Sequence, residues 1–418
     1  MLFKMALRNI LRHKRRTLIS VITIAVGIMF YIAMDSLFNG VDRLLVESIV
    51  KFSDSSIVVY SQEYDENRRG YPLDRGVKDF EFIKKTVSAI DGVEGVVYRT
   101  QFLGELVFGN KSKYIVGTVI NPSIDSQVFE IKDHIKGSYL SGDGEEVLIG
   151  SILAKKLGIR LGDYITISAR TVEGTYNALD FKVVGLVESP NVLLNESGVI
   201  ISYTSANKLL NLRDTKTLVH VKVKWNKGES IPFYLKNLEK ISKEMRDKLE
   251  GYRVYTVKDI YGDFLLLMDQ KRTTSYLITF LVLIIAGVGI ANSILMAVYE
   301  RIREIGVLMA MGMKPITIRR LFLLEGTLIG VIGGLFGIIL GVIADIFMIY
   351  VGYDISSLYK ELNPSDLGMP VWGVFYGEWN IWAFVVGGVF ATLTAIISAY
   401  IPSRYASKLR VTECLKFV

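Results

Sequence analysis

Four long apolar segments alternate with charged segments along the chain and set its architecture. Uncharged runs cover residues 17–34, 273–299, 326–344 and 379–403. A helix rises about 1.5 Å per residue and crosses a hydrocarbon layer of about 30 Å in roughly 17–25 residues, so each run can span a membrane. We therefore predict four transmembrane helices, at residues 17–35, 273–299, 321–351 and 379–403, with both termini on one side.

The polar insert between the first two spans, residues 36–272, has the pattern of a separate α+β domain. Helical periodicity covers residues 77–90 and 232–249. Each of these helices lies between two short β-type runs, which are residues 56–60, 93–98, 217–223 and 252–256. Two β-α-β units are therefore expected to bracket the insert.

The centre of the insert, residues 146–167, predicts a strand, a short helix and a second strand. Gly158 is expected to end the helix, and Gly162 with Asp163 to form a turn, rather than to cradle a phosphate. The chain contains no G-x-x-x-x-G-K-[S/T] sequence, so it binds no nucleotide through a P-loop. After Gly262 the sequence runs into the second span without a Pro or Gly break, which predicts one continuous helix.

The link between the second and third spans, residues 300–320, predicts a short charged helix lying against the membrane surface. Arg301, Glu304 and Lys314 project away from its apolar face. The opposite face carries Ile302, Ile305, Leu308, Met309 and Gly312. Two interpretations stay open: an amphipathic linker resting on lipid headgroups, or a helix that docks into a cytoplasmic partner.

Charge indicates the orientation of the spans. The arm 1–16, the link 300–320 and the tail 404–418 together carry 15 Lys and Arg, against Lys360 alone in the loop 352–378. The positive-inside rule then places both termini and the link in the cytoplasm, and the insert outside. This topology explains the net charge of +7, so we expect no nucleic-acid binding. An outer aromatic belt would contain Trp372, Tyr376, Trp379 and Trp382.

The first span is expected to be an uncleaved anchor. Its 18 apolar residues exceed a typical signal-peptide core, and no small-x-small site follows them. The single cysteine, Cys414, lies in the tail, so the outer domain is expected to hold together without a disulfide.

Small and polar residues mark expected packing surfaces in the spans. Glycines at four-residue spacing in the third span let helix backbones approach closely. The candidate packing residues are Gly330, Gly333, Gly334, Gly337, Gly341 and, in the second span, Asn292. A dimer partner and the fourth span both remain open as the surface that the glycines contact. Asp345, near the outer end of the third span, is expected to snorkel towards the interface.

At this point four motifs, in order along nearly the whole chain, resemble those of FtsX/MacB-type ABC permeases. Residues 303–312 resemble the signature R-E-I-G-x-x-x-A-x-G, and residues 6–18 the N-terminal cytoplasmic helix of the family. The outer-domain signature is matched by Ile149, Gly150, Leu153, Ala154, Leu157, Gly158, Gly162 and Asp163. The C-terminal motif is matched by Pro402, Ala406, Glu413 and Leu415, with Val411 where the family usually has Pro.

The resemblance implies an α-helical membrane permease with a MacB-like periplasmic core domain inserted between its first two helices. Such a half-transporter pairs with a second permease, as a homodimer or heterodimer, on two copies of a cytoplasmic ABC ATPase that holds ATP and Mg. The residues that the resemblance assigns to ATPase coupling are Arg303, Glu304, Ile305, Gly306, Ala310 and Gly312. The alternative is that Arg303 and Glu304 form a local ion-pair network with Glu300 and Arg301.

The family couples ATP binding to movement of the outer domain, which is called mechanotransmission. Length, four spans and one insert are most similar to the lipoprotein-releasing, LolC/LolE-like subgroup, in the cytoplasmic (inner) membrane with a periplasmic carrier. Export of peptides or macrolide-like molecules with an adaptor, and activation of a cell-wall hydrolase, are the alternatives.

Two rival classes of function fit the sequence less well. A membrane-embedded enzyme needs a nucleophile with a base, or two carboxylates, and the predicted spans offer neither. The three histidines, His13, His134 and His220, lack metal-ligand spacing, so no catalytic residue, metal or cofactor is expected in this chain. A sensor or adhesin would have no need for the charged link.

Overall fold

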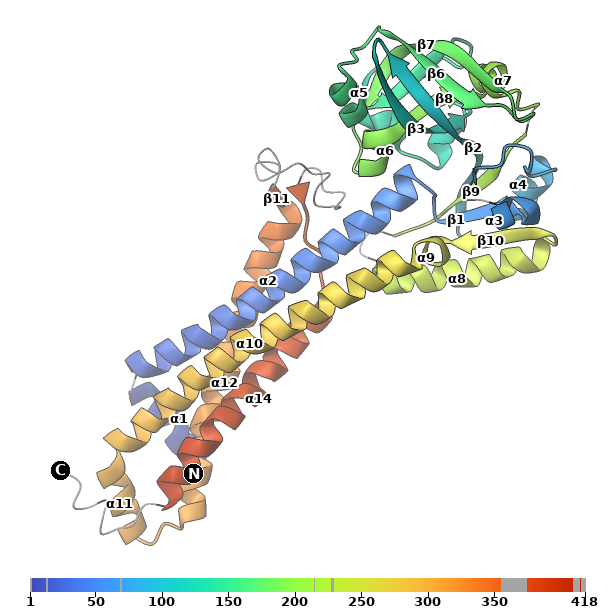
Figure 1. Ribbon diagram of the computed structural model, residues 1–418. Coiled ribbons are helices and arrows are strands. Elements are labelled where there is room, and N and C mark those ends of the chain that lie inside the picture. The colour runs from blue at the N-terminus through green and yellow to red at the C-terminus, as the bar shows by residue number, and fades with distance from the viewer. Residues whose placement is uncertain are drawn as a thin grey trace. The chain divides into compact units, whose positions relative to one another are not determined.

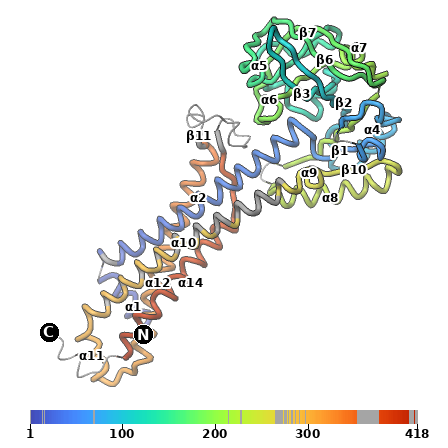
Figure 2. The backbone as a smooth tube through the Cα atoms, in the orientation of Figure 1, coloured from blue at the N-terminus to red at the C-terminus, as the bar shows by residue number. Residues whose placement is uncertain are grey.

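The computed structural model describes residues 2–12, 14–67, 70–213, 215–226, 229–354, 374–408 and 414 (Figures 1 and 2). The chain divides into two compact units. The helical unit contains Met1–Asp42, Leu267–Asp354 and Val374–Val418, and the α+β unit contains Arg43–Leu266. The predicted domain boundaries, 36 and 272, fall seven and six residues from these limits, inside helices that continue past them.

The described part of the helical unit contains four long helices and two short ones. They are α1 (Leu2–Arg12), α2 (Lys14–Phe52), α10 (Gly262–Glu300), α11 (Ile302–Ala310), α12 (Pro315–Tyr350) and α14 (Ile381–Lys408). Three described helices are long and apolar enough to cross a membrane: Thr17–Phe52, Pro315–Tyr350 and Ile381–Lys408. The expected second span lies within α10, which is one unbroken helix as predicted, but there a shorter apolar stretch, Gly287–Glu300, is identified. A membrane span at 273–299 therefore stays a prediction.

Helix α14 packs against a stripe of glycines on one side of α12. The stripe consists of Gly326, Gly330 and Gly334, which face Ala399, Ala395 and Ala391 in turn. A Cβ added to Gly330 would lie 2.4 Å from the Cβ of Ala395, closer than two carbon atoms can approach. Small residues on both helices thus let the two backbones pack closely.

Helix α2 packs against a second stripe of glycines on α12. This stripe consists of Gly333, Gly337 and Gly341, which face Ile24, Ile28 and Ile32. A Cβ added to Gly337 would lie 2.7 Å from the Cβ of Ile28. The sequence left open whether the glycines contact the fourth span or a dimer partner. In the structure α14, the predicted fourth span, packs against one stripe, and α2, the predicted first span, packs against the other (Figure 1). Asn292 is exposed on α10 and belongs to neither contact.

The prediction that Asp345 snorkels to the interface is wrong, because its side chain is 1% exposed. The segment before α14 contacts the middle of α2 and the C-terminal end of α12: the amide of Gly377 donates to the carbonyl of Met348, and the amide of Glu378 donates to the carbonyl of Ser36. Asp35, also buried there, accepts hydrogen bonds from Asn39 at 2.8 Å and Asn380 at 2.7 Å. Tyr376, Trp379 and Trp382 are exposed, as an aromatic belt requires, and Trp372 lies outside the described residues.

The α+β unit is built on a ten-stranded sheet in the order β10-β1-β9-β2-β3-β8-β5-β7-β4, with β6 paired to β2 and β7. Its strands are β1 (Ile57–Ser61), β2 (Val93–Phe108), β3 (Lys111–Ile120), β4 (Ile135–Gly137), β5 (Glu146–Gly150), β6 (Tyr164–Arg170), β7 (Tyr176–Val187), β8 (Gly198–Ser202), β9 (Leu218–Val223) and β10 (Tyr252–Thr256). Its helices are α3 (Gln62–Asn67), α4 (Phe80–Ser88), α5 (Ser151–Leu157), α6 (Val192–Ser197), α7 (Tyr203–Leu210), α8 (Ile231–Lys248) and α9 (Val257–Ile260). Strands β11 (Tyr353–Asp354) and β12 (Val374–Phe375) form a separate pair.

The two predicted β-α-β units are present, and they interleave. Strand β9 lies between β1 and β2, and β1 lies between β9 and β10, with every neighbouring pair antiparallel. Each unit is therefore a split β-α-β, the pattern of a ferredoxin-like fold. Helices α4 and α8 pack on these strands around Val59, Ile83, Val221 and Leu238, all fully buried. We call these four strands and two helices the interleaved lobe.

The remaining strands, β3–β8, form an inserted lobe between β2 and β9. It begins and ends at paired residues, since Arg99 of β2 lies opposite Leu218 of β9. The central sequence 146–167 folds as predicted into β5, α5 and β6. Gly158 caps α5 with a φ of 84°, and Gly162 has a φ of 90°, so both glycines form turns, as expected.

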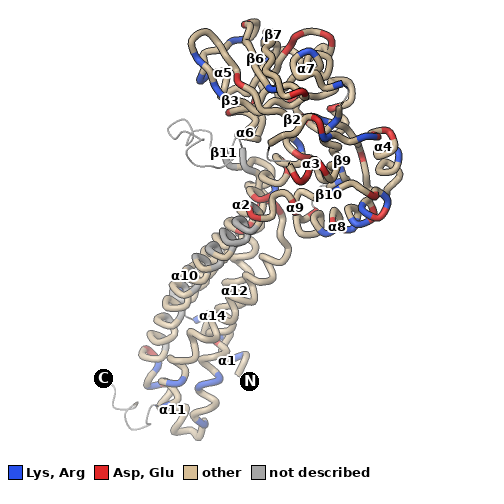
Figure 3. The backbone as a smooth tube through the Cα atoms, turned by 45° about the vertical axis from the view of Figure 1, so that its right-hand side comes forward, with Lys and Arg blue, Asp and Glu red and all other residues tan. Residues whose placement is uncertain are grey.

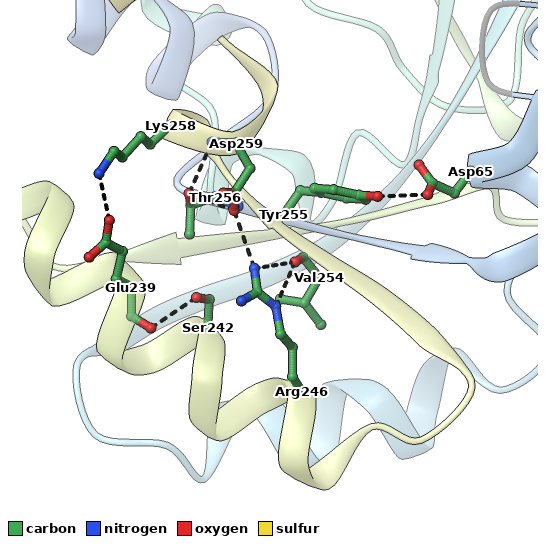
Figure 4. A network of polar contacts seen from close by, with 9 residues as sticks. All are labelled: Asp65, Glu239, Ser242, Arg246, Val254, Tyr255, Thr256, Lys258 and Asp259. Atoms are coloured by element: carbon green, nitrogen blue, oxygen red, sulfur yellow. Dashed lines mark hydrogen bonds and ion pairs between the residues drawn. The ribbon is translucent and has the colours of Figure 1, made fainter. Parts of the chain in front are cut away.

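Polar contacts fix the junction between β10 and α9, where the chain leaves the interleaved lobe (Figure 4). The hydroxyl of Thr256 accepts from the amide of Asp259, and the Asp259 carboxylate accepts from the amide of Thr256, which forms a capping box at the start of α9. Arg246 of α8 donates to the carbonyl of Val254 at 2.9 Å and to Asp259 at 3.3 Å. These bonds fix α9, after which α10 begins.

A buried charged cluster joins the two lobes. The Arg99 guanidinium donates to both carboxylate oxygens of Asp125, at 2.8 and 2.7 Å, and it lies over the ring of Phe129. His220 is fully buried beside this pair, with its Nδ1 3.0 Å from the carbonyl of Asp54. Burial, and then the charge of Arg99, lowers the pKa of His220 to about 3, so this imidazole is neutral.

Candidate coupling site at one end of the helical unit

The segment between α10 and α12 forms a short capped helix at the end of the helical unit (Figure 1). Arg301, with a φ of −117°, separates α10 from α11. Gly312 ends α11 in the left-handed region at a φ of 91°, and the amide of Met313 reaches back to the carbonyl of Leu308 at 3.0 Å. Pro315 then starts α12. Gly312 is therefore needed for its backbone conformation, and a Cβ there would meet no atom within 4 Å.

One face of α11 packs inward. Ile302 and Ile305 are each 3% exposed, and Gly306 is buried with them. Ile305 belongs to the same apolar cluster as Ile10 of α1 and Phe322 of α12. This face is held by the chain itself, so Ile305 and Gly306 fix the helix in place rather than meeting a partner directly.

The opposite face of α11 and the start of α12 expose apolar side chains. Val307 is 47% exposed, Met311 71% and Ile316 49%. Ala310 and Gly312 are exposed among them. We call these five residues the docking face. At a charged helix end, such a group of exposed apolar side chains is typical of a contact with a protein partner or with a membrane surface.

A polar network beside α11 joins three helices and the residue between α10 and α11. Glu325 of α12, 4% exposed, accepts from the amide of Asn9 in α1 and lies 3.2 Å from Arg301. Arg301 also pairs with Glu304 at 3.0 Å, and Arg12 reaches Glu304 at 3.4 Å. The network therefore ties the N-terminal helix, the α10–α11 junction and α12 together.

The structure divides the six predicted coupling residues into two groups. Arg303, Glu304, Ala310 and Gly312 are exposed, while Ile305 and Gly306 are buried. Glu304 does form the local ion pair with Arg301 that was the alternative interpretation, and it adds Arg12 as a further partner. Its side chain stays 48% exposed, so these pairs leave the carboxylate reachable from outside.

Sequence reasoning missed Glu325 and three members of the docking face, Val307, Met311 and Ile316. Glu325 directly precedes the uncharged run 326–344 and looked like its boundary. A signal for the other three was available, since they lie three to five residues apart and away from the buried positions Ile302 and Ile305.

Basic residues gather at this end of the helical unit, as Figure 3 shows near α1 and α11. The exposed ones include Lys4, Arg8, Lys14, Arg15, Arg303, Lys314 and Arg320. Within the described parts of the chain, no group of three or more His, Cys, Asp or Glu is placed to hold a metal ion.

Two family models match the chain. A MacB-like periplasmic core domain matches residues 17–239, and an FtsX-like permease C-terminal domain matches residues 276–411. Three relatives illustrate the similarity. An uncharacterised ABC transporter permease of Methanocaldococcus jannaschii is 24% identical over 98% of this chain and 96% of its own length. The uncharacterised ABC transporter permease YknZ of Bacillus subtilis is 22% identical over 99% and 98%.

The macrolide export ATP-binding/permease protein MacB of Aggregatibacter actinomycetemcomitans is 26% identical over 81% of this chain. The match covers 52% of that relative, so the chain spans about half of its length.

Proposed function

Because the chain belongs to the family with a MacB-like periplasmic core domain and carries an FtsX-like permease domain, and is thus an ABC transporter permease, we propose that its docking face couples it to a separate ABC ATPase. The observation that carries the proposal is the two-sided packing of α11. Its inner face is fixed by Ile302 and Ile305, and its outer face presents Met311 and Val307. Movement of a bound ATPase would therefore be passed to the helices as a rigid contact.

The polar network supports transmission of this movement. A push on α11 acts on Arg301, whose guanidinium holds Glu325 of α12, so α11 cannot shift without disturbing α12. Helix α10 runs unbroken from Gly262 to Glu300, and an unbroken helix transmits displacement along its axis. This is the mechanotransmission mechanism, in which ATP binding moves the extracytoplasmic domain.

The test replaces an apolar contact with a charge. Met311→Lys should reduce co-purification of the chain's ABC ATPase, and ATPase activity linked to the permease, about tenfold, because a cation would be buried in an apolar contact. Phe233→Lys is the matched control, since Phe233 of α8 is 64% exposed and lies in the α+β unit. Normal ATPase recovery with Met311→Lys would refute the docking face.

For orientation, we propose that the α11 end of the helical unit lies in the cytoplasm, together with both termini. The gathered basic residues support it, because Lys and Arg are retained on the cytoplasmic side. The chain would then sit in the cytoplasmic (inner) membrane with its α+β unit outside.

For the second permease subunit, we propose that α10 contributes to the contact. Asn292 lies exposed on a helix whose other exposed side chains include Leu281, Ile285, Val288 and Met296. An amide facing lipid is unfavourable, and a bond to a second copy satisfies it. Asn292→Cys should form an intermolecular disulfide under oxidation in a Cys414→Ser background, and failure to form it would place the dimer contact elsewhere.

For cargo, the name of the MacB relative favours export of a macrolide-like molecule over lipoprotein release. MacB is named for macrolide export, and the similarity to a lipoprotein-releasing subgroup stays a prediction. Release of an acylated protein from spheroplasts, assayed beside efflux of a macrolide, separates the two. Loss of neither in a null strain would favour activation of a cell-wall hydrolase.

A further inference from the structure

The α+β unit has an open groove of about 1030 Å³ that the coupling mechanism does not use. Strands β2, β3 and β6 form one wall, and residues 70–74 and 171–174 form the others. Every lining residue belongs to the α+β unit.

The register of the strands places an acidic side chain among aromatic ones. Glu105 of β2 lies directly opposite Tyr114 of β3 and Ser168 of β6. Tyr176 of β7 lies opposite Arg170 of β6, two residues further along. Tyr114 is 83% exposed and Tyr176 82%, which is unusual for large rings that border a groove. The groove thus offers free aromatic faces around Glu105.

Arginines outside the lining pair with two of its three carboxylates, since Arg75 lies 3.8 Å from Asp74 and Arg213 pairs with Glu173. Asp74, Glu105 and Glu173 are acidic, and Arg170 is the basic residue among the lining side chains. Glu173 is neutralised by Arg213, and the Arg170 Nε donates to the carbonyl of Gly174 at 3.0 Å. Glu105 has no hydrogen-bond or ion-pair partner among the described residues. Glu105 is therefore the carboxylate of the lining that no described cation pairs with, and the Arg170 guanidinium, which bonds to a neutral carbonyl, also has no carboxylate partner among the described residues.

The rim is shaped by a strained residue. Tyr71 is a non-glycine residue with a φ of 48°, in the left-handed region that aromatic side chains rarely adopt. Its ring is half-buried at the groove. Such conformations persist where the surrounding structure imposes them, and they cluster at binding sites.

We propose that this groove binds an amphipathic organic cation, with Glu105 facing its positive charge and the rings of Tyr114 and Tyr176 covering its apolar body. A carboxylate attracts the cation, and aromatic faces add a cation–π contribution. An anion of the same shape would meet the same rings and the wrong charge. The amphipathic cation would belong to the class of molecules that the transporter exports, and this part of the proposal rests on the proposed function.

The experiment uses two ions of the same shape and opposite charge. Full-length permease in nanodiscs, without any ATPase, is titrated with tetraphenylphosphonium or with tetraphenylborate, and the free ion is read by a selective electrode. Empty nanodiscs supply the lipid background. We expect saturable binding of the cation alone, with the Kd raised about tenfold by Glu105→Gln and by Tyr114→Ala. Asp143→Asn, an exposed carboxylate outside the groove, is the matched control and should leave the Kd unchanged.

Each other outcome overturns the proposal. Equal binding of both ions, or a Kd that Glu105→Gln and Tyr114→Ala leave unchanged, removes the groove as a cation site. An equal effect of Asp143→Asn reduces it to a general surface charge. Because no ATPase is present, loss of binding leaves the docking face untouched, and loss of coupling with normal binding would count against the proposed function alone.

Discussion

Removing Arg301 should release α11 from the helices beside it. The Arg301 and Glu325 side chains are 12% and 6% exposed, and their charged atoms lie 3.2 Å apart. At an effective dielectric constant of about 20, Coulomb's law gives an attraction of about 5 kcal/mol at that distance. Most of it offsets the cost of burying both groups. In Arg301→Met the buried carboxylate of Glu325 loses the cation that lies 3.2 Å from it, and breaking a buried ion pair in this way costs about 3–5 kcal/mol.

The double variant tests the origin of that cost. Arg301→Met with Glu325→Leu removes both charges, and replacing a buried pair by apolar residues is about neutral or stabilising. Stability should therefore fall in the single variant and return in the double variant. A penalty that came from lost packing of the long Arg301 side chain would persist in both.

The readout is the exposure of Ile305, which is 3% exposed on the inner face of α11. A cysteine there, in a Cys414→Ser background, should react slowly with a thiol reagent in detergent. A local loss of about 3 kcal/mol corresponds to labelling faster by about 100-fold in Arg301→Met, with recovery in the double variant. Unchanged labelling in Arg301→Met, or no recovery in the double variant, would refute this account of the network.

Three further predictions test other parts of the molecule. The native pKa of His220, about 3, lies below its unfolded value of about 6.5, so the unfolded chain binds more protons as the pH falls. The unfolding free energy of the α+β unit should then fall by about 2 kcal/mol from pH 7.5 to pH 5, measured by urea titration of Trp225 fluorescence, and His220→Gln should remove this slope. Gly330→Ala should lower the free energy of unfolding by about 1–3 kcal/mol, because its Cβ would lie 2.4 Å from the Cβ of Ala395. Adding Ala395→Gly should restore stability, and an unchanged stability in Gly330→Ala alone would show that α14 shifts to make room. Cysteines at Asn110 and Ser230 should react with an impermeant thiol reagent on intact cells, and one at Lys314 only in opened cells; labelling of Lys314 from outside would reverse the topology.

Local patterns in the sequence predicted the elements well and their partners poorly. Periodicity located α4 and α8, and the turns at Gly158 and Gly162 followed from glycine spacing. The interleaving of β1, β9, β2 and β10 joins residues about 160 positions apart, as in the pairing of Ile57 with Val221, and periodicity within a short window carries no record of it.

The same limit affected the membrane helices and the candidate site. Gly326–Gly330–Gly334 and Gly333–Gly337–Gly341 have the same spacing, so their different neighbours were not predictable from the pattern. The prediction for Asp345 failed because the pattern along α12 carries no record of Asp35 and Ser36, which come about 310 positions earlier and lie beside it. At the coupling site, the motif located α11, but the split between an inner and an outer face depended on how α1 and α12 pack against it.

The pairing of Arg99 with Leu218 has a consequence for the history of such proteins. The inserted lobe starts and ends at two residues that pair with each other across the antiparallel strands β2 and β9. The lobe can therefore be deleted or exchanged without changing the strand pairing of the interleaved lobe. Replacing residues 100–217 with a two-residue hairpin would leave a complete four-stranded, two-helix fold attached to the same membrane helices. Exchange of the gene segment for the inserted lobe could therefore supply a new recognition surface, while the interleaved lobe and its link to the membrane helices stay unchanged.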